Sequence, residues 1–175
     1  MPKLIIDLNA TKENAINELN DFIDNRLHSY ESLRNYDLGE DNHQNVSLLS
    51  PYIRHRLITE QEVISAALDK FPLPKIEKFI QEVLWRTYWK GWLELRPRVW
   101  DDYKDSILIN NDKKQSLEKV LSYETDIDCF NIWTKELIET NYLHNHARMW
   151  YASIWIHTLK LPWEAGANLF LKHLL

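Results

Sequence analysis

The sequence predicts an all-α protein, and three observations lead to that prediction. Apolar residues recur at helical spacing along most of the chain, beginning with Ile16, Leu19, Phe22, Ile23 and Leu27. Residues that cap helices and prolines that end them separate these runs. No segment shows the alternation, β-branched clusters or Asn-Gly turns of strands. A length of 175 residues fits one domain, so we expect a compact multi-helix domain over residues 1–175.

The N-terminal elements are two predicted helices and a loop. Thr11 caps an amphipathic helix that reaches about residue 35. Residues 37–45 are polar and contain one of only three glycines, which predicts a surface loop. Ser50 is followed by a proline, the pattern of an N-cap and first helical position, and predicts a short helix over residues 51–56.

The remaining elements follow in order. Thr59 and Glu62 form a capping box that opens a helix to about residue 70, where two prolines end it. A long helix over residues 75–95 comes next and stops before Pro97. Weak patterning in the following stretch predicts a long connection over residues 101–122, with a short helix near 117–121. The last predicted helices cover residues 130–139, 146–160 and 163–175.

Composition restricts the class of protein. The net charge of −5 argues against a protein that coats nucleic acid, although a local basic face remains possible. The single Cys129 excludes a disulfide framework within the chain and fits a reducing compartment. Neither a secretory signal nor a run of eighteen apolar residues is present, so we expect a cytoplasmic protein with no membrane partner. Eight Trp and eight Tyr suggest stacking surfaces as well as core filling.

Two groups of residues in the middle of the chain could bind a ligand. Hydroxyls at Ser47 and Ser50 beside a helix start would suit an anion, although most such helix starts bind nothing. The 75–95 helix carries Arg86 among apolar residues, where an arginine either reaches solvent or meets an anion. A separate stripe of that helix holds one carboxylate and three indoles: Glu82, Trp85, Trp89 and Trp92.

A third group opens the helix predicted from residue 146. Its polar residues are His144, Asn145, His146 and Arg148. A helix buried on several sides must give such groups partners, because unpaired burial costs several kcal/mol. A bound ligand would supply them, and an ordinary solvated helix start would serve equally well.

Three stretches together resemble the helical flavin-binding domain of the photolyase/cryptochrome family. They are SLLSPYIRHRLI (residues 47–58), FIQEVLWRTYWKGW (79–92) and ELIETNYLHNHARMWYASIW (136–155). The likeness runs in collinear order from about Tyr30 to Leu175. It implies FAD as cofactor, reduced if the protein is catalytic, and no metal.

The resemblance also implies roles for individual residues. The residues similar to the family's FAD contacts are Tyr30, Arg34, Ser47, Leu48, Leu49, Ser50, Arg86 and Arg148. Those that match or adjoin the pocket for a flipped-out pyrimidine dimer are Glu82, Trp85, Trp89, His144, Asn145, His146 and Met149. Trp163 resembles the middle member of the tryptophan chain that relays electrons to the flavin.

The sequence departs from the family pattern in several places. Val46 stands where a threonine is usual in the phosphate loop, and Asp126 and Asn131 replace a glycine and an aspartate. The α/β antenna domain that precedes this region in the family, and the segment after it that contacts the flavin ring, are not in the sequence. We therefore expect an apolar last helix either to fold back or to meet a second copy or partner chain that completes the flavin pocket.

Three functions are compatible with these residues. The first is an FAD-binding subunit for light-dependent repair of pyrimidine dimers or for blue-light sensing, with damaged DNA as a partner. The second is a non-catalytic descendant that binds nucleic acid without FAD. The third is a helical module that binds a different chromophore or a protein partner in its aromatic groove.

Overall fold

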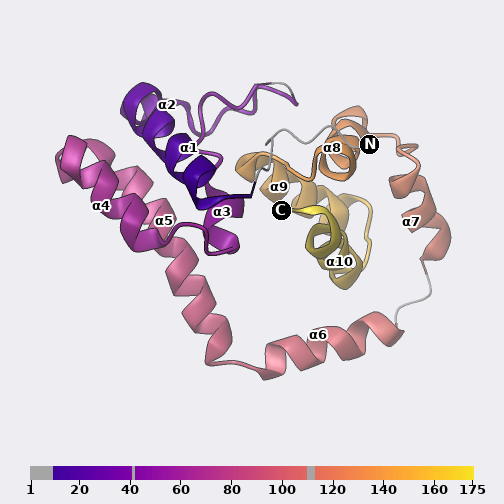
Figure 1. The fold of residues 1–175 in the computed structure, drawn as a ribbon. Helices are drawn as coiled ribbons and strands as arrows, with labels where there is room; N and C mark the ends of the chain where they lie inside the picture. Colours follow the sequence, from indigo (N-terminus) through magenta and orange to yellow (C-terminus); the bar gives the residue numbers. More distant parts are fainter. Residues whose placement is uncertain (1–9, 41, 110–112) are drawn as a thin grey trace. The chain divides into compact units, whose positions relative to one another are not determined.

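The computed structural model describes residues 10–40, 42–109 and 113–175, and these residues are helical with no strand among them. They divide into two compact units, residues 10–95 and residues 96–175, each of which has its own core. The prediction of an all-α protein is confirmed, whereas a single domain over residues 1–175 stays a prediction. Figure 1 labels the helices.

The first unit contains five α-helices and a short 3-10 turn. They are α1 (Lys12–Asn25), η1 (Leu27–Ser29), α2 (Tyr30–Leu33), α3 (Ser50–Arg54), α4 (Glu60–Lys70) and α5 (Leu73–Glu94). The predicted caps are confirmed: Thr11 accepts a hydrogen bond from the Asn14 amide, and Thr59 forms a capping box with Glu62. The N-cap of α3 is Leu49 rather than Ser50, and Pro51 lies in its first turn.

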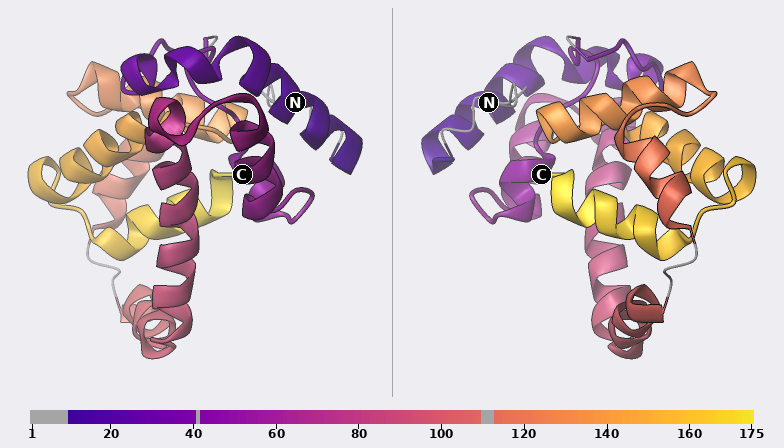
Figure 2. Two further views of the ribbon diagram at one scale, coloured as in Figure 1. Left: turned by 90° about the vertical axis from the view of Figure 1, so that its left-hand side faces the viewer. Right: turned by 90° about the vertical axis from the view of Figure 1, so that its right-hand side faces the viewer.

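Packing of α1 against the first half of α5 forms the core of this unit. The Phe22 ring lies 4.9 Å from Phe79 and meets Tyr30 edge-on at 5.8 Å, measured between centroids. Val63 and Ala67 bring the buried face of α4 into the same cluster. The second half of α5 extends beyond this core (Figures 1 and 2), and many of its large side chains are exposed.

The prediction of one helix from Thr11 to about residue 35 is wrong, because the chain breaks after Asn25. The break lies at Arg26, whose side chain is 7% exposed. Its guanidinium pairs with Glu18 at 2.5 Å and Asp21 at 2.8 Å, and donates to the Val46 carbonyl at 3.1 Å. Apolar residues continue at helical spacing through the break, so their pattern does not reveal it. The buried arginine ties α1 to the chain just before Ser47.

The predicted polar loop over residues 37–45 is confirmed apart from residue 41, which lies outside the described residues. Asn45 is buried, and its amide donates to the carbonyls of Leu33 and Tyr36 at 2.8 and 2.6 Å. These bonds close the loop on the C-terminal end of α2.

The second unit also contains five α-helices. They are α6 (Arg98–Ile109), α7 (Lys114–Leu121), α8 (Asp128–Thr140), α9 (Asn145–Ser153) and α10 (Trp163–His173), with the π-helical turn η2 (Ile154–Thr158) between the last two. The predicted long connection over residues 101–122 is wrong where α6 occupies it; residues 110–112 lie outside the described residues. The many charged residues of α6 favoured the prediction of a connection. The helix contacts α10 through Tyr103 and Trp163.

Stacked aromatic rings form the core of the second unit. Phe130 of α8 and Tyr151 of α9 stack with centroids 4.2 Å apart at an interplanar angle of 9°. The Tyr151 hydroxyl lies 3.1 Å from that of Thr134, and Trp155 donates its indole N–H to the Pro162 carbonyl at 2.7 Å. Each buried polar atom of these aromatics therefore has a partner.

Asn141 joins the ends of two helices in this unit. It lies in the left-handed conformation (φ 59°) that ends α8. Its side chain donates to the His173 carbonyl at 2.8 Å, and its own carbonyl accepts from the Leu175 amide at 3.0 Å. The apolar end of the chain thus folds back on its own unit, one of the two arrangements expected from the sequence.

Among the described residues, no helix has the length and apolar character that crossing a membrane requires.

Candidate functional site

The predicted phosphate loop has an unusual backbone. Leu48 adopts a left-handed conformation (φ 55°) and Leu49 follows in the right-handed helical region (φ −79°, ψ −11°). Consecutive residues of opposite hand direct their amides toward a common side, an arrangement that binds anions. Leu49 is 1% exposed and anchors the turn, while the Ser50 side chain remains exposed. The Ser47 hydroxyl accepts a long bond from the Leu49 amide at 3.4 Å.

Arg34 and Glu82 form an ion pair, although the sequence suggested separate roles for them. Arg34 Nη1 lies 2.7 Å from Glu82 Oε1. Tyr30 lies beside this pair, and burial, with the Glu82 charge adding to it, raises the pKa of the Tyr30 hydroxyl to about 12. This neutral phenol and the ion pair therefore connect α2 to the middle of α5, at the start of the aromatic stripe.

Arg86 is a cation with an unused donor. Its Nε is buried without a hydrogen-bond partner and lies 3.6 Å from Glu60 Oε1. Burial lowers the pKa of Arg86, Glu60 opposes that shift, and the charges of Arg54 and Arg56 lower the pKa further. A buried N–H donor without a partner costs about 1–3 kcal/mol, so this group suits an anion that would accept from it.

The aromatic stripe of α5 faces solvent. Trp85, Tyr88 and Trp89 are 51%, 55% and 53% exposed. The indoles of Trp85 and Trp89 lie nearly parallel, with centroids 6.4 Å apart and an interplanar angle of 25°. Trp92 continues the row 6.0 Å from Trp89. Such half-exposed rings are stacking platforms rather than core. The sequence indicated Trp85 and Trp89 but missed Tyr88.

The polar start of α9 is satisfied largely within itself. His144 caps the helix by accepting from the His146 amide at 3.2 Å, and Asn145 Oδ1 accepts from Arg148 Nη2 at 2.8 Å. Met149 is 55% exposed. The His146 ring lies 6.1 Å from that of Trp150, and its Nδ1 is buried without a hydrogen-bond partner.

Arg148 differs from the arginines of the first unit because no carboxylate of the described residues pairs with it. Desolvation lowers the pKa of its guanidinium, and Tyr142 partly opposes the shift. A desolvated arginine whose polar partner is one amide oxygen retains capacity for an anionic partner.

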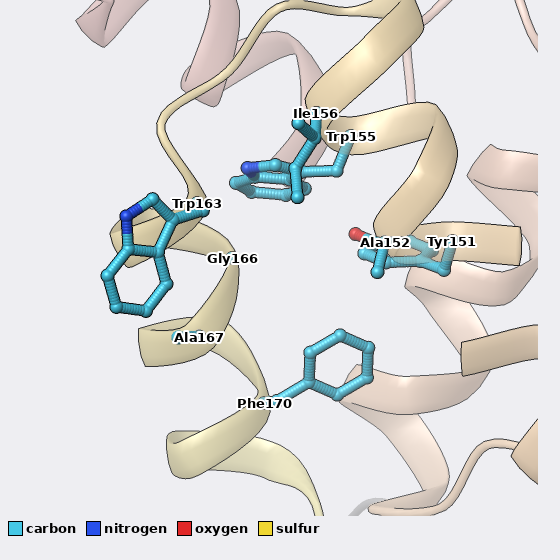
Figure 3. Close-up of a pocket in the computed structure, with 8 residues that line it drawn as sticks. All are labelled: Tyr151, Ala152, Trp155, Ile156, Trp163, Gly166, Ala167 and Phe170. Carbon is cyan, nitrogen blue, oxygen red and sulfur yellow. The ribbon is translucent and has the colours of Figure 1, made fainter. Parts of the chain in front are cut away.

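Trp163 lies at the rim of an apolar pocket of about 210 Å³ between α9, η2 and α10 (Figure 3). Tyr151, Trp155 and Phe170 supply the other rings of its wall, and Gly166 allows the close approach of Trp155. Trp163 is 50% exposed, and its ring lies 5.8 Å from that of Tyr103. The ring of Tyr103 therefore lies beside the residue predicted to relay electrons.

The candidate residues thus form two groups, one in each unit. Residues 10–95 hold Tyr30, Arg34, Ser47, Leu48, Leu49, Ser50, Glu82, Trp85, Arg86 and Trp89. Residues 96–175 hold His144, Asn145, His146, Arg148, Met149 and Trp163. Their individual roles stay predictions.

Comparison with known proteins identifies the family. Residues 79–175, more than half of the chain, match the family described as the FAD binding domain of DNA photolyase. The chain belongs to this family. It is a photolyase FAD-binding domain, and the resemblance carried by residues 47–58, 79–92 and 136–155 is confirmed.

Individual photolyases are similar over most of the chain. A deoxyribodipyrimidine photo-lyase of Neurospora crassa is 25% identical over 95% of the chain and 28% of its own length. A (6-4) photolyase of Agrobacterium fabrum is 31% identical over 80% of the chain and 28% of its own length. The crystal structure of a class III photolyase from Agrobacterium tumefaciens superposes with a TM-score of 0.78 at 26% identity, covering 94% of this chain and 34% of that one. The chain therefore spans about a third of these photolyases.

Proposed function

We propose that this photolyase domain holds FAD within a protein that repairs pyrimidine dimers in DNA with light. The turn at Leu48 and Leu49 carries the proposal, because it presents backbone amides where the family resemblance places the FAD pyrophosphate. The buried, unpartnered Nε of Arg86 supports it, since an anionic cofactor would satisfy that donor. The residues present on the phosphate side therefore fit FAD.

Each residue of the phosphate side has a proposed task. The hydroxyls of Ser47 and Ser50 and the amides between them bind the pyrophosphate. Arg86 neutralises its charge, and Arg34 holds Tyr30 and Glu82 in place beside it. When FAD is bound, the chemistry that it supplies is light-driven electron transfer to the lesion.

The proposed lesion contacts use stacking and hydrogen bonding. Trp85 and Trp89 offer nearly parallel, solvent-facing indoles on which an extruded pyrimidine dimer can stack. Glu82 is held by Arg34 at 2.7 Å and presents its second carboxylate oxygen to a base edge. Asn145, His146 and Met149 are proposed to contribute contacts from the second unit, and Trp163 to relay electrons.

The absorption spectrum of the purified protein tests the proposal. We expect the bands of bound flavin, or their appearance when FAD is titrated into apoprotein. Arg86→Ala should weaken FAD binding at least tenfold, because a charge-assisted contact contributes about 1.5–3 kcal/mol. Lys75→Gln is the matched control, since Lys75 is an exposed cation in the first turn of the same helix. A folded protein that binds no FAD at millimolar concentration would contradict the proposal and favour the non-catalytic alternative.

We also propose that Arg148 takes a carboxylate from outside the described residues: a further segment of the protein, a second copy or a partner chain. Its lowered pKa and the absence of a paired carboxylate among the described residues support this. Sedimentation with and without FAD distinguishes a second copy from the other sources. A monomer at all concentrations would exclude the second copy.

A further inference from the structure

The end of α3 is a complete helix-stop motif with an unusual residue in it. The Leu57 amide donates to the Tyr52 carbonyl at 2.9 Å, and the Arg56 amide donates to the Ile53 carbonyl at 3.1 Å. These two bonds define a Schellman motif in which Arg56 occupies the left-handed position, at φ 60°. Glycine is usual there because its lack of Cβ removes the steric conflict. The chain therefore holds an arginine in a backbone conformation that disfavours it.

The side chain of Arg56 is directed by a neighbouring carboxylate. Its Nη1 lies 2.6 Å from Glu60 Oε2, while 55% of the side chain remains exposed. The other oxygen of Glu60 faces Arg86 Nε at 3.6 Å, and Lys90 is near enough for its charge to act on Glu60 as well. A strained residue kept in place by its surroundings points to a function for its side chain.

This cluster carries excess positive charge. Among the described residues, Arg56 and Arg86 form ion pairs with the carboxylate of Glu60 and the charge of Lys90 acts on it too, so these cations outnumber the carboxylate that they share. The excess is fixed on one face, because Arg86 and Lys90 are one helical turn apart on α5 and Glu60 fixes Arg56 beside them.

An exposed aromatic ring, that of Trp89, lies next to this charge. Trp89 directly precedes Lys90 on α5 and follows Arg86 by three positions, which places its ring at the edge of the basic face. Tyr88 meets Trp89 edge-on at 5.3 Å. Basic side chains that bind the backbone, beside rings that stack on bases, are the combination by which proteins hold single-stranded nucleic acid.

We propose that Arg56 and Lys90 form a phosphate-binding patch that holds the backbone of a single-stranded nucleic acid segment, with a base against Trp89. The choice of a nucleic acid rests on the proposed function. The patch is separate from the Ser47–Ser50 loop, and it is the reason for an arginine at position 56. Glu60 acts as a positioning residue that fixes the direction of Arg56.

Arg56→Gly tests the patch without endangering the fold, because glycine is the residue that the motif prefers. The probe is a fluorescein-labelled, undamaged 16-nucleotide DNA strand, followed by anisotropy over a range of salt concentrations. We expect binding about tenfold weaker at low salt and a log–log salt slope lower by about 0.7, the value for one phosphate contact on a single strand. Lys90→Gln should act in the same direction, and Lys75→Gln should change neither quantity.

Two further measurements separate the possible sources of phosphate. Bound FAD, measured by absorbance, should be equal in Arg56→Gly and the parent, and inorganic pyrophosphate should not displace the strand at concentrations that displace FAD. Unchanged DNA affinity and salt slope in Arg56→Gly would overturn the proposal, as would loss of FAD in place of DNA. Absence of FAD binding together with the expected DNA result would overturn the proposed function and leave the patch intact.

Discussion

The two units of this photolyase domain hold their buried polar groups by different means. In residues 10–95 ion pairs hold two arginines: Arg26 is buried between Glu18 and Asp21, and Arg34 pairs with Glu82. In residues 96–175 hydroxyls and amides form neutral bonds, such as the contact between Thr134 and Tyr151. An ion pair depends on the charge state of both partners, and a hydrogen bond between neutral groups does not. The ion pairs of the first unit should therefore respond to pH and to charge changes, and the contact between Thr134 and Tyr151 should not.

The largest expected effect is at Arg26. Arg26→Met should lower the free energy of unfolding by about 3 kcal/mol, because two carboxylates and the Val46 carbonyl lose a buried partner. Urea denaturation followed by circular dichroism measures it. Arg98→Met is the control on an exposed helical arginine. Equal, small losses in both variants would show that the first unit does not depend on its buried charge.

Removing a hydrogen bond between neutral groups should lower the free energy of unfolding by less. Tyr151→Phe removes the hydroxyl that contacts Thr134, and should lower the free energy of unfolding by about 1–1.5 kcal/mol. The loss should be the same at pH 5 and pH 8, since burial raises the pKa of Tyr151 well above its usual value and keeps it neutral. A pH-dependent loss in this range would break the distinction between the units.

Arg56→Gly should change stability in the opposite direction. Removing the side chain from a left-handed backbone should raise the free energy of unfolding by up to about 1 kcal/mol, because the conformational conflict disappears. Loss of the exposed contact with Glu60 offsets a few tenths of that gain. The midpoint of thermal unfolding measures the net change. A clear decrease would mean that the ion pair outweighs the backbone conflict.

Acid should loosen the start of α4 in the first unit. The hydrogen bonds that Glu62 accepts from Lys12 and from the Thr59 amide and hydroxyl lower its pKa from 4.5 to about 2. Because the folded-state pKa is lowered, the stabilising effect is present above pH 4.5 and is lost as pH falls toward 2. Glu62→Gln should remove this dependence. Amide hydrogen exchange in α4 should accelerate over that interval more than exchange in α8, and equal acceleration would contradict the prediction.

The helix starts could be predicted from the sequence because their causes are local. Thr11 and Thr59 bond to amides three residues away, so the cap and its partner appear in one short stretch. The start of α6 was missed for a related reason. Its apolar residues Val99, Tyr103 and Ile107 recur at helical spacing, but they lie among charged residues, and Tyr103 meets Trp163, 60 residues later.

The site was predictable by residue type but not by pairing. Arg34 and Glu82 were given separate roles, and the structure joins them across 48 positions of sequence. Nothing local in the sequence marks Arg56 as an arginine in a left-handed conformation. The available signal was a helix end that lacks a glycine. It indicates a left-handed residue of another type only once the structure shows that α3 ends at Arg54.

The bond from Arg26 to the Val46 carbonyl connects the order of α1 to the proposed ligand binding at the Ser47–Ser50 loop, so each should affect the other. The arginine that closes α1 also holds the residue just before the Ser47–Ser50 loop. Under the proposed function, the free energy that couples anion binding to the order of α1 is the same in both directions. Substitutions at Glu18 or Asp21 should therefore lower the affinity for the anion, although neither carboxylate belongs to the loop proposed to contact it.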